Sequence, residues 1–482
     1  MTPLSYDLIV VGAGTAGLPC AIEAARGGGR VLLIEKGESI GGTLQVSGGH
    51  MSAAGTKQQQ EKGITDSAEA HRADIERISR GTVRSDIVDA VLERAAATVD
   101  WLQDHGFDFA PETPRLVYGH EPYSTPRTYY GTDEGRSILA VLERLLAPHL
   151  ESGAVTLRLR CAASRLCLES GRVSGVILRE GGLDEEEAGA GAVVLATGGY
   201  GSAPDLFAEI DKRPLVSAAQ PTATGDGLRM ARTLGAALAG DDAFLPTFGG
   251  LPADDPGRVQ WKDRPLLVAT ERPPWEIYVD RAGRRWIAED EPSIDLKEQA
   301  LAAIPDLTFF TVFDDRAVDA SPNMVVGWSG NDLRERAGRR AGVFVGPTLL
   351  ELAKKAGIDP PGLEAAIARY NTFVSDQSDP DFGRRYLPAP IATPPFYAME
   401  NHGITLITFA GLDVDAQMRV RTTSGAVIPG LYAAGEIIGA AATCGHSFCG
   451  GMMVTPALVF GRLLGQRLAK AGTTSSSRPP FS

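Results

Sequence analysis

The sequence predicts an α/β fold in which a parallel-sheet domain, built from both ends of the chain, is interrupted by an α+β domain. Three observations support this prediction. A glycine-rich turn follows an apolar run at residues 5–17, a second glycine-rich stretch stands at residues 430–454, and residues from about 240 to 395 combine proline-rich loops with mixed helices. The chain has 482 residues, of which 43% are hydrophobic, so it can bury two cores.

The first turn reads Gly12-Ala-Gly14-Thr-Ala-Gly17, between a strand-like run and a helix-like stretch. In such a turn the first glycine permits a sharp bend, the second lets the backbone approach a pyrophosphate, and the third lets the helix pack closely. Glu35 ends the next apolar run, where a carboxylate can bind both ribose hydroxyls and would repel a 2′-phosphate. This pattern predicts a Rossmann-type dinucleotide-binding unit.

The C-terminal stretch indicates which dinucleotide is bound. Residues 430–436 read as a short strand that runs into a turn at Glu436, and a helix begins after Gly451. Glu436 can bind ribityl hydroxyls, and the helix N-terminus can stabilise negative charge at the flavin N1 and C2 carbonyl. A return of the chain end to the first domain suits a long flavin, so we expect FAD.

Several motifs in a fixed order resemble the fumarate reductase and succinate dehydrogenase flavoprotein family, which also contains the 3-ketosteroid dehydrogenases. They are residues 40–56, 196–199, 224–227, 283–289 and 430–436. The resemblance implies a glutathione-reductase-like FAD-binding domain at residues 1–240 and 396–470, with a capping domain at residues 241–395. Residues 471–482 have no apolar face and are expected to be disordered.

The residues expected to bind FAD lie in these motifs. They are Gly12, Gly14, Thr15, Ala16, Gly17, Glu35, Lys36, Gly42, Thr43, Ser47, Gly48, Gly49, Thr197, Gly198, Asp226, Glu436, Gly451, Met452 and Val454. Thr43 stands where the membrane-bound relatives have a histidine that bonds covalently to the flavin, so the resemblance implies noncovalent FAD. For the nearby His50, a backbone hydrogen bond is favoured over a contact with the flavin.

The chain departs from the fumarate reductases at the positions that handle the substrate. Those enzymes hold a dicarboxylate with two histidines and an arginine, and a second arginine in the cap delivers the proton. The residues found here are Leu245 and either Leu406 or Ile407 for the histidines, Phe448 for the clamping arginine, and Ser293 or Ile294 for the proton donor. A buried carboxylate without a partner costs several kcal/mol. The substitutions therefore predict a pocket for a neutral, largely apolar molecule rather than for fumarate.

The ketosteroid branch fits better, although two of its polar groups are missing. Residues 118–137 resemble its tyrosine-containing loop, but its carbonyl-binding tyrosine is replaced by Phe448 and its cap tyrosine by Ser293. Desaturation beside a carbonyl needs a donor to the carbonyl, a base for the α-proton and flavin N5 as the hydride acceptor. His446 is the leading acid–base or donor candidate, followed by Tyr129 and Tyr130. A turn-holding role for His446 is equally compatible, and apolar lining is favoured for the tyrosines.

The first hypothesis is an FAD-dependent dehydrogenase or reductase that acts on a CH–CH bond next to a carbonyl in a small, hydrophobic, cyclic substrate. An external electron donor or acceptor would complete the reaction. Two alternatives remain open at this point. One is a flavin oxidase or hydroxylase that acts on an alcohol or amine, and the other is a flavoprotein that only transfers electrons.

Composition argues against several other classes of protein. The net charge of −13 argues against a nucleic-acid partner. Five cysteines without Cys-x-x-Cys spacing argue against a structural zinc, an iron–sulfur cluster or an attached haem, and no metal is expected. No apolar run is long enough to span a membrane, and the first strand begins too early for a signal peptide. A cytoplasmic location is therefore the expectation.

Overall fold

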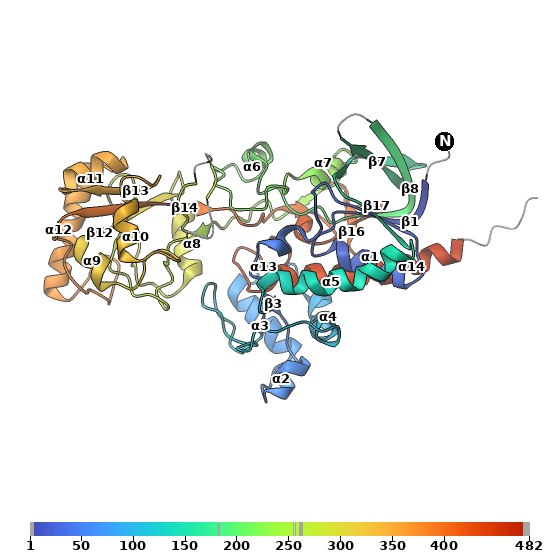
Figure 1. Cartoon of the computed structure of the whole chain (residues 1–482), viewed down its shortest axis with the longest axis horizontal. Coiled ribbons are helices and arrows are strands. Elements are labelled where there is room, and N and C mark those ends of the chain that lie inside the picture. Colours follow the sequence, from blue (N-terminus) through green and yellow to red (C-terminus); the bar gives the residue numbers. More distant parts are fainter. Residues whose placement is uncertain (1–3, 182–183, 254, 256, 260–263, 476–482) are drawn as a thin grey trace, which may run out of the picture.

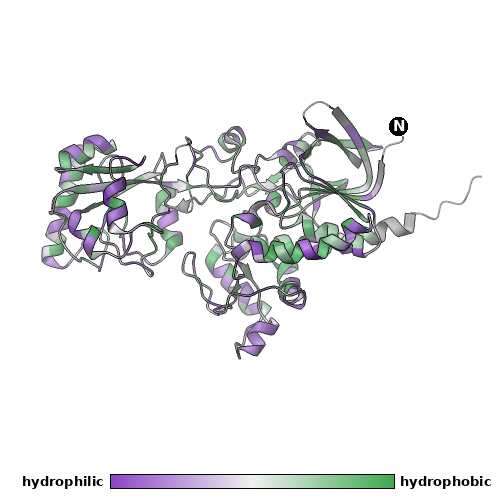
Figure 2. Ribbon diagram, viewed as in Figure 1, coloured by the Kyte–Doolittle hydropathy of each residue, from purple (hydrophilic) through white to green (hydrophobic). Residues whose placement is uncertain are grey.

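A computed structural model describes residues 4–181, 184–253, 255, 257–259 and 264–475. Two separate sheets form the centres of two parts of the molecule, which lie at opposite sides of Figure 1. Figure 2 shows that the helices of both parts carry hydrophobic residues along one side and hydrophilic residues along the other. This is the pattern of helices that pack on a core and face water. The predicted α/β fold, with a parallel-sheet domain interrupted by a second domain, is confirmed.

The larger sheet has a parallel centre. Its strand order is β16-β17-β8-β1-β2-β5, and β7 joins β8 and β6 at one side. The strands of this centre are rich in Val, Leu and Ile, as expected of strands with both faces covered. The parallel strands are β1 (Leu4–Val11), β2 (Val31–Ile34), β5 (Val155–Arg158), β8 (Asp184–Leu195) and β17 (Val427–Ala433). The antiparallel strands are β6 (Cys161–Glu169), β7 (Arg172–Glu180) and β16 (Arg419–Arg421).

Helices from both ends of the chain pack against this sheet. Helix α14 (Val454–Ser475) lies against α1 (Gly17–Arg26), and α5 (Glu134–Glu151) also contacts α1. The contact of α14 with α1 is close, because a Cβ at Gly461 would lie 2.2 Å from the Ala16 carbonyl oxygen. Helix α14 continues to Ser475, which is within the segment expected to be disordered, and residues 476–482 lie outside the described residues.

A group of helices and a long loop complete the first part. The helices are α2 (Lys57–Glu61), α3 (Ala68–Ser79) and α4 (Ser85–Asp104), and the two-residue strands β3 (Met51–Ser52) and β4 (Thr128–Tyr129) pair beside them. The fully buried Arg127 binds Asp66 at 2.8 Å and Asp74 at 2.9 Å. Because Asp74 also accepts hydrogen bonds from Ser124, this network fixes the loop at residues 118–127 against α3.

Further short elements lie between the strands and longer helices of the first part. They are η1 (Gly42–Gln45), α6 (Pro204–Ile210), α7 (Asp226–Arg232), β9 (Leu238–Ala239), β15 (Gly411–Leu412), η3 (Glu436–Ile438) and α13 (Ala441–Cys444). Strands β9 and β15 pair with each other, just before the chain enters the second part and just after it returns.

The second part, hereafter the cap, is an antiparallel sheet covered by helices. The sheet has the order β10-β14-β12-β11, and β13 also pairs with β14. Its strands are β10 (Thr247–Phe248), β11 (Ile277–Val279), β12 (Thr308–Asp314), β13 (Val343–Gly346) and β14 (Phe396–Ile404). The central strand β14 lies beyond residue 395, so the cap sheet extends past the boundary expected from the sequence.

The cap helices are α8 (Ile294–Ala302), α9 (Asp315–Ala320), α10 (Gly330–Arg336), α11 (Leu349–Ala356) and α12 (Pro360–Asp376). Helix α8 contacts β10 and β14 and lies on the side of the cap that approaches the first part (Figure 1). No helix within the described ranges is both long and apolar enough for a transmembrane segment.

Candidate functional site

The three glycines of the first turn have distinct surroundings. Gly12 has a φ of 104°, and a Cβ there would lie 2.3 Å from the Ala196 carbonyl oxygen. A Cβ at Gly17 would lie 1.8 Å from the Gly12 carbonyl oxygen, whereas a Cβ at Gly14 would meet no atom within 4 Å. Gly12 and Gly17 are therefore required by packing of the protein on itself, and Gly14 borders open space that a phosphate can enter. The intervening Thr15 and Ala16 lie at the N-terminus of α1.

Glu35 lies at the end of β2 with its carboxylate held next to this turn. The backbone N–H of Ala13 donates to Oε2 at 3.1 Å, and the backbone N–H of Gly37 donates to Oε1 at 2.7 Å. Both bonds leave acceptor capacity on a carboxylate, which has about four lone-pair sites. The position is the one in which an acidic side chain can accept hydrogen bonds from a ribose.

The loop at residues 40–49 closes over the turn. The N–H of Gly41 donates to the Ala13 carbonyl at 2.8 Å, and a Cβ at Gly42 would lie 3.5 Å from the Gly14 Cα. Thr43 is exposed in η1. Further along the loop, the Ser47 carbonyl accepts from Gly135 N–H at 3.0 Å, so Gly48 and Gly49 are held against the start of α5. Gly42 thus lies beside Gly14, whereas Ser47, Gly48 and Gly49 lie against the start of α5.

Two other expected cofactor residues bind each other. The Lys36 ammonium lies 2.6 Å from Asp226 Oδ2 and also contacts the Thr224 hydroxyl. This ion pair joins the end of β2 to the start of α7. Near it, the buried Thr197 hydroxyl has no hydrogen-bond partner in the described part of the chain, and a Cβ at Gly198 would meet no atom within 4 Å. An orphaned donor beside open backbone fits a bound polar ligand.

The C-terminal residues form the other wall. The N–H and hydroxyl of Thr408 donate to Glu436 Oε1 at 3.0 and 3.2 Å. Burial raises the pKa of the Glu436 carboxyl to about 7, although the hydrogen bonds from Thr408 oppose this shift. Gly451, with a φ of 79°, packs against β3, since a Cβ there would lie 2.5 Å from the Ser52 nitrogen. Met452 follows directly, and Val454 is the first residue of α14. These walls together fit an elongated dinucleotide.

Three of the four expected substrate residues gather in one apolar cluster. Leu245, from the segment before β10, and Phe409 are buried there, and Ile407 and Phe448 pack against them. Leu406, the alternative to Ile407, is half-buried and lies outside this cluster. The sequence places these residues far apart, and the fold brings them together where the cap joins the first part.

The sequence reasoning missed His120, which lies on this cluster. Its ring centroid is 4.1 Å from that of Phe448. Burial lowers the pKa of His120 to about 3, with the nearby His50 adding to the shift, so the ring is neutral. Its Nδ1 is buried and has no partner among the described atoms. Residues 118–137 resemble the tyrosine-containing loop of the ketosteroid branch, and that resemblance points to the tyrosines rather than to His120.

Ser293 lies directly across from the His120 loop, as the N-cap of α8. Its hydroxyl accepts from Leu296 N–H at 3.1 Å and donates to the Glu121 carboxylate, which joins the cap to the first part. Asp295, two residues on, binds Arg80 at 2.7 Å in a second contact between the parts. Glu298, on the next turn, accepts from Phe248 N–H at 3.2 Å. The sequence predicted Ser293 and Ile294 as site residues in this segment, but it did not predict the carboxyl groups of Asp295 and Glu298.

The other expected catalytic residues have separate surroundings. His446 has a half-exposed side chain whose Nε2 lies 3.5 Å from Asp242 Oδ2. The Tyr129 hydroxyl is buried 2.6 Å from the Thr56 hydroxyl, and burial raises its pKa well above the usual range. The Tyr130 hydroxyl donates to Glu112 at 2.6 Å. The fold therefore does not bring His446, Tyr129 and Tyr130 to a common point.

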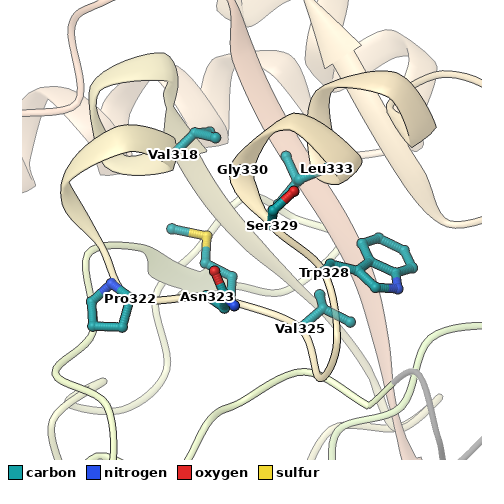
Figure 3. A pocket seen from close by; sticks show the side chains of 9 residues that line it. Val318, Pro322, Asn323, Val325, Trp328, Ser329, Gly330 and Leu333 are labelled. Atoms are coloured by element: carbon teal, nitrogen blue, oxygen red, sulfur yellow. The ribbon is translucent and has the colours of Figure 1, made fainter.

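Tyr130 instead lines an open cavity of about 470 Å³. The wall also includes Gly48 from the cofactor loop and His50, whose ring centroid is 5.0 Å from that of Tyr130. Burial lowers the pKa of His50, and the positive charge of Arg115 adds to the shift. A second cavity, of about 10 Å³, lies inside the cap between α9 and α10 and has room for one water molecule (Figure 3). None of the expected site residues lines that second cavity.

Comparison with known proteins agrees with this geometry. Residues 7–451 match a family model described as an FAD binding domain. The chain is 30% identical to a fumarate reductase (cytochrome) of Shewanella frigidimarina over 97% of this chain and 77% of that protein. It is 28% identical to a 4-oxocyclohexanecarboxylate 2-dehydrogenase of Sinomonas cyclohexanicum, covering 97% and 94% of the two chains. A 3-ketosteroid Δ1-dehydrogenase structure from Sterolibacterium denitrificans superposes with a TM-score of 0.80 at 22% identity, covering 97% and 100%.

Proposed function

Because the chain belongs to the FAD-binding flavoprotein family that includes the fumarate reductases, we propose that it interconverts a CH–CH bond and a C=C bond next to the carbonyl of an uncharged, hydrophobic, cyclic substrate. An FAD-dependent CH–CH oxidoreductase is the activity class of this family. The proposal adds the kind of substrate and the preference against fumarate. It also assigns noncovalent FAD, since Thr43 stands where a covalent histidine would be.

The observation that carries the proposal is the apolar cluster of Leu245, Ile407 and Phe448. Each stands where the resemblance implies a residue that binds a carboxylate. At the interface nearby, Asp295 is paired with Arg80 and the Glu121 carboxylate accepts a hydrogen bond from Ser293. A dicarboxylate among the apolar side chains would lose its hydration without gaining a partner from the cluster. The relative from Sinomonas cyclohexanicum is named for a cyclic ketone that also carries a carboxylate, so it supports the cyclic carbonyl part of the proposed substrate class.

The cofactor residues divide into groups with different tasks. Gly14 and the N-terminus of α1 would bind the pyrophosphate, and Glu35 would bind the adenosine ribose. Glu436 and the N-terminus of α14 would bind the flavin half. When bound, FAD supplies the two-electron hydride chemistry of the reaction. The protein has to orient the substrate carbonyl, exclude water and move one proton.

His120 is well placed to orient the carbonyl. A neutral imidazole can donate a hydrogen bond without carrying a charge into an apolar pocket. Its tilted ring contact with Phe448 holds the imidazole beside the cluster. His446, which the sequence favoured, stays in the proposal as a half-exposed residue of the Phe448 loop, with its Nε2 3.5 Å from Asp242 Oδ2.

Anaerobic stopped-flow absorbance of the flavin tests the proposal. The oxidised enzyme is mixed with cyclohexanone-type ketones, 3-ketosteroids or succinate, and the reduced enzyme with the corresponding enones or fumarate. We expect flavin bleaching or reoxidation with the uncharged cyclic carbonyl compounds and at least a hundredfold slower reaction with succinate and fumarate. A faster reaction with the dicarboxylates would overturn the substrate assignment. Rapid reoxidation by oxygen alone would favour an oxidase.

A further inference from the structure

We propose that Tyr123 and Thr443 are positioning residues of the flavin site, and that they act through the backbone of residues 450–453. Each hydroxyl binds one carbonyl of this segment, so that the N–H of the same peptide faces the flavin and stabilises its reduced form. This inference rests on the proposed function, which assigns the segment before α14 to the flavin half of FAD. It names two side chains that set how readily the flavin accepts electrons.

Both hydroxyls donate short hydrogen bonds to this segment. The Tyr123 hydroxyl donates to the Gly450 carbonyl, and the Thr443 hydroxyl donates to the Met452 carbonyl, each at 2.6 Å. Tyr123 and Thr443 are 5% and 3% exposed, so these bonds are shielded from water. Burial raises the pKa of Tyr123 well above its usual range, so the phenol keeps the proton that it donates.

The other carbonyls from Cys449 to Met453 also have partners within the protein. The bonds that complete the set are Met452 N–H to the Cys449 carbonyl, Thr455 N–H to the Gly451 carbonyl and Ala457 N–H to the Met453 carbonyl, at 3.0, 3.1 and 3.3 Å. In contrast, the N–H groups of Gly451 and Met453 have no acceptor among the residues that the structure describes. The segment therefore offers donors to a ligand and keeps its carbonyl oxygens bound.

The planar peptide group links each bound carbonyl to one of these donors. In a trans peptide the C=O and the following N–H point in opposite directions. Because Tyr123 holds the Gly450 carbonyl, the Gly451 N–H points away from the Tyr123 hydroxyl. The Met453 N–H points away from the Thr443 hydroxyl for the same reason. Rotation of either peptide would present a carbonyl oxygen in place of the donor.

The segment lies between a buried network and the cofactor motifs. On one side, the Tyr123 ring packs edge-on against the His71 ring of α3, with centroids 5.2 Å apart. Near the other end of the segment, a Cβ at Gly435 would lie 3.1 Å from the Ala16 Cβ and 4.0 Å from the Ala457 Cβ. The first turn of α14 thus meets the glycine-rich turn and the residue before η3. Donors that point away from Tyr123 are available to a flavin bound along these motifs.

The direction of the effect follows from the charge of the flavin. At neutral pH a reduced flavin carries negative charge over N1 and the C2 carbonyl, and groups near these atoms tune its electronics. N–H donors at a helix N-terminus favour such a charge. Loss of the Tyr123 hydroxyl would leave the Gly450 carbonyl without its partner, which favours rotation of that peptide. The reduced form would then lose a donor, and the flavin would become harder to reduce.

The test is the two-electron midpoint potential of the bound flavin, measured by spectroelectrochemical titration without any substrate. We expect Tyr123→Phe and Thr443→Val each to disfavour the reduced form about tenfold, which is a shift of about 30 mV to more negative potential. Thr443→Ser keeps a hydroxyl and should keep the wild-type potential. Tyr397→Phe is the matched control, because it removes a buried hydroxyl that donates to Asp315 at 2.9 Å within the cap. It should also keep the wild-type potential.

A wild-type potential in flavin-loaded Tyr123→Phe or Thr443→Val would overturn the role of that residue, and an equal shift in Tyr397→Phe would overturn both. If Tyr123→Phe binds no flavin, the comparison of Thr443→Val with Thr443→Ser decides. The measurement is independent of the substrate. A protein that shows the expected shifts but reacts with no cyclic carbonyl compound retains this inference and loses the proposed substrate class. A wild-type chain that binds no flavin contradicts both proposals.

Discussion

The aromatic rings of His120 and Phe448 are in contact, with centroids 4.1 Å apart and planes inclined by 42°, and so join the loop at residues 118–127 to the loop that precedes α14. Phe448 also packs on Leu245 and Phe409. Phe448 thus connects the segment that leads into the cap, the loop at residues 118–127 and the residues just before α14. Its size and apolar character set the chemistry of the pocket.

Phe448→Ala should therefore weaken binding of an apolar substrate. Removing a largely buried ring costs apolar contact of roughly 1.5–3 kcal/mol, which corresponds to a KM about 10- to 150-fold higher. Steady-state kinetics with a cyclic enone would measure this change. Phe382→Ala removes a more exposed ring of the cap and serves as the control. An unchanged KM in Phe448→Ala would exclude this residue from the substrate pocket.

Gly14 and Gly17 should respond differently to replacement by alanine. Gly17→Ala places a Cβ 1.8 Å from a backbone oxygen, so it should lower the unfolding free energy of the apoprotein by several kcal/mol. Gly14→Ala meets no protein atom and should leave apoprotein stability within about 1 kcal/mol while weakening FAD binding. Denaturant unfolding without FAD, followed by flavin titration, separates the two effects. Equal loss of apoprotein stability would contradict the assignment of open space at Gly14.

Glu35→Gln should weaken FAD binding by about 10-fold or more, since a neutral amide replaces a charged acceptor of the ribose hydroxyls. The two backbone bonds to Glu35 are compatible with the amide oxygen on one side only, so a small loss of stability is also expected. Fluorescence of released flavin measures the affinity. Glu38→Gln, with an 80% exposed side chain nearby, is the matched control and should bind FAD as wild type does.

The elevated pKa of Glu436 predicts a pH dependence of apoprotein stability. Its folded pKa of about 7 lies above the unfolded value near 4.5, so the folded state binds the extra proton between these limits. The unfolding free energy should therefore decrease as pH rises from about 4.5 to 7, by at most about 3 kcal/mol from this group. The difference between wild type and Glu436→Gln across this range isolates the contribution. A difference that stays constant with pH would refute it.

The cofactor site was largely predictable because its requirements are local in sequence. A turn of three glycines and an acid after the next strand specify their own geometry, and the structure places Gly12, Gly14, Gly17 and Glu35 accordingly. The resemblance supplied the apolar cluster, whose members are distant in the chain. The ion pair of Lys36 with Asp226 was not foreseen, because it depends on how β2 and α7 approach each other.

The acidic groups at the interface could not be predicted in the same way. Asp295 and Glu298 occur in the short helix α8, where a solvated carboxylate would satisfy the same sequence pattern. Their burial becomes evident only when α8 is docked against the loop that carries Glu121. Likewise, Tyr129 was a catalytic candidate by motif, and only its burial against Thr56 shows how remote its hydroxyl is from water.

Within the described residues, no strand belongs to both sheets, and every strand of the cap sheet comes from one uninterrupted stretch between β9 and β15. Mutations, insertions or losses within that stretch leave the order and register of the flavin-side strands unchanged. The residues that this stretch contributes to the candidate site, Leu245 and Ile407, can therefore change while the strands of the larger sheet keep their pairing.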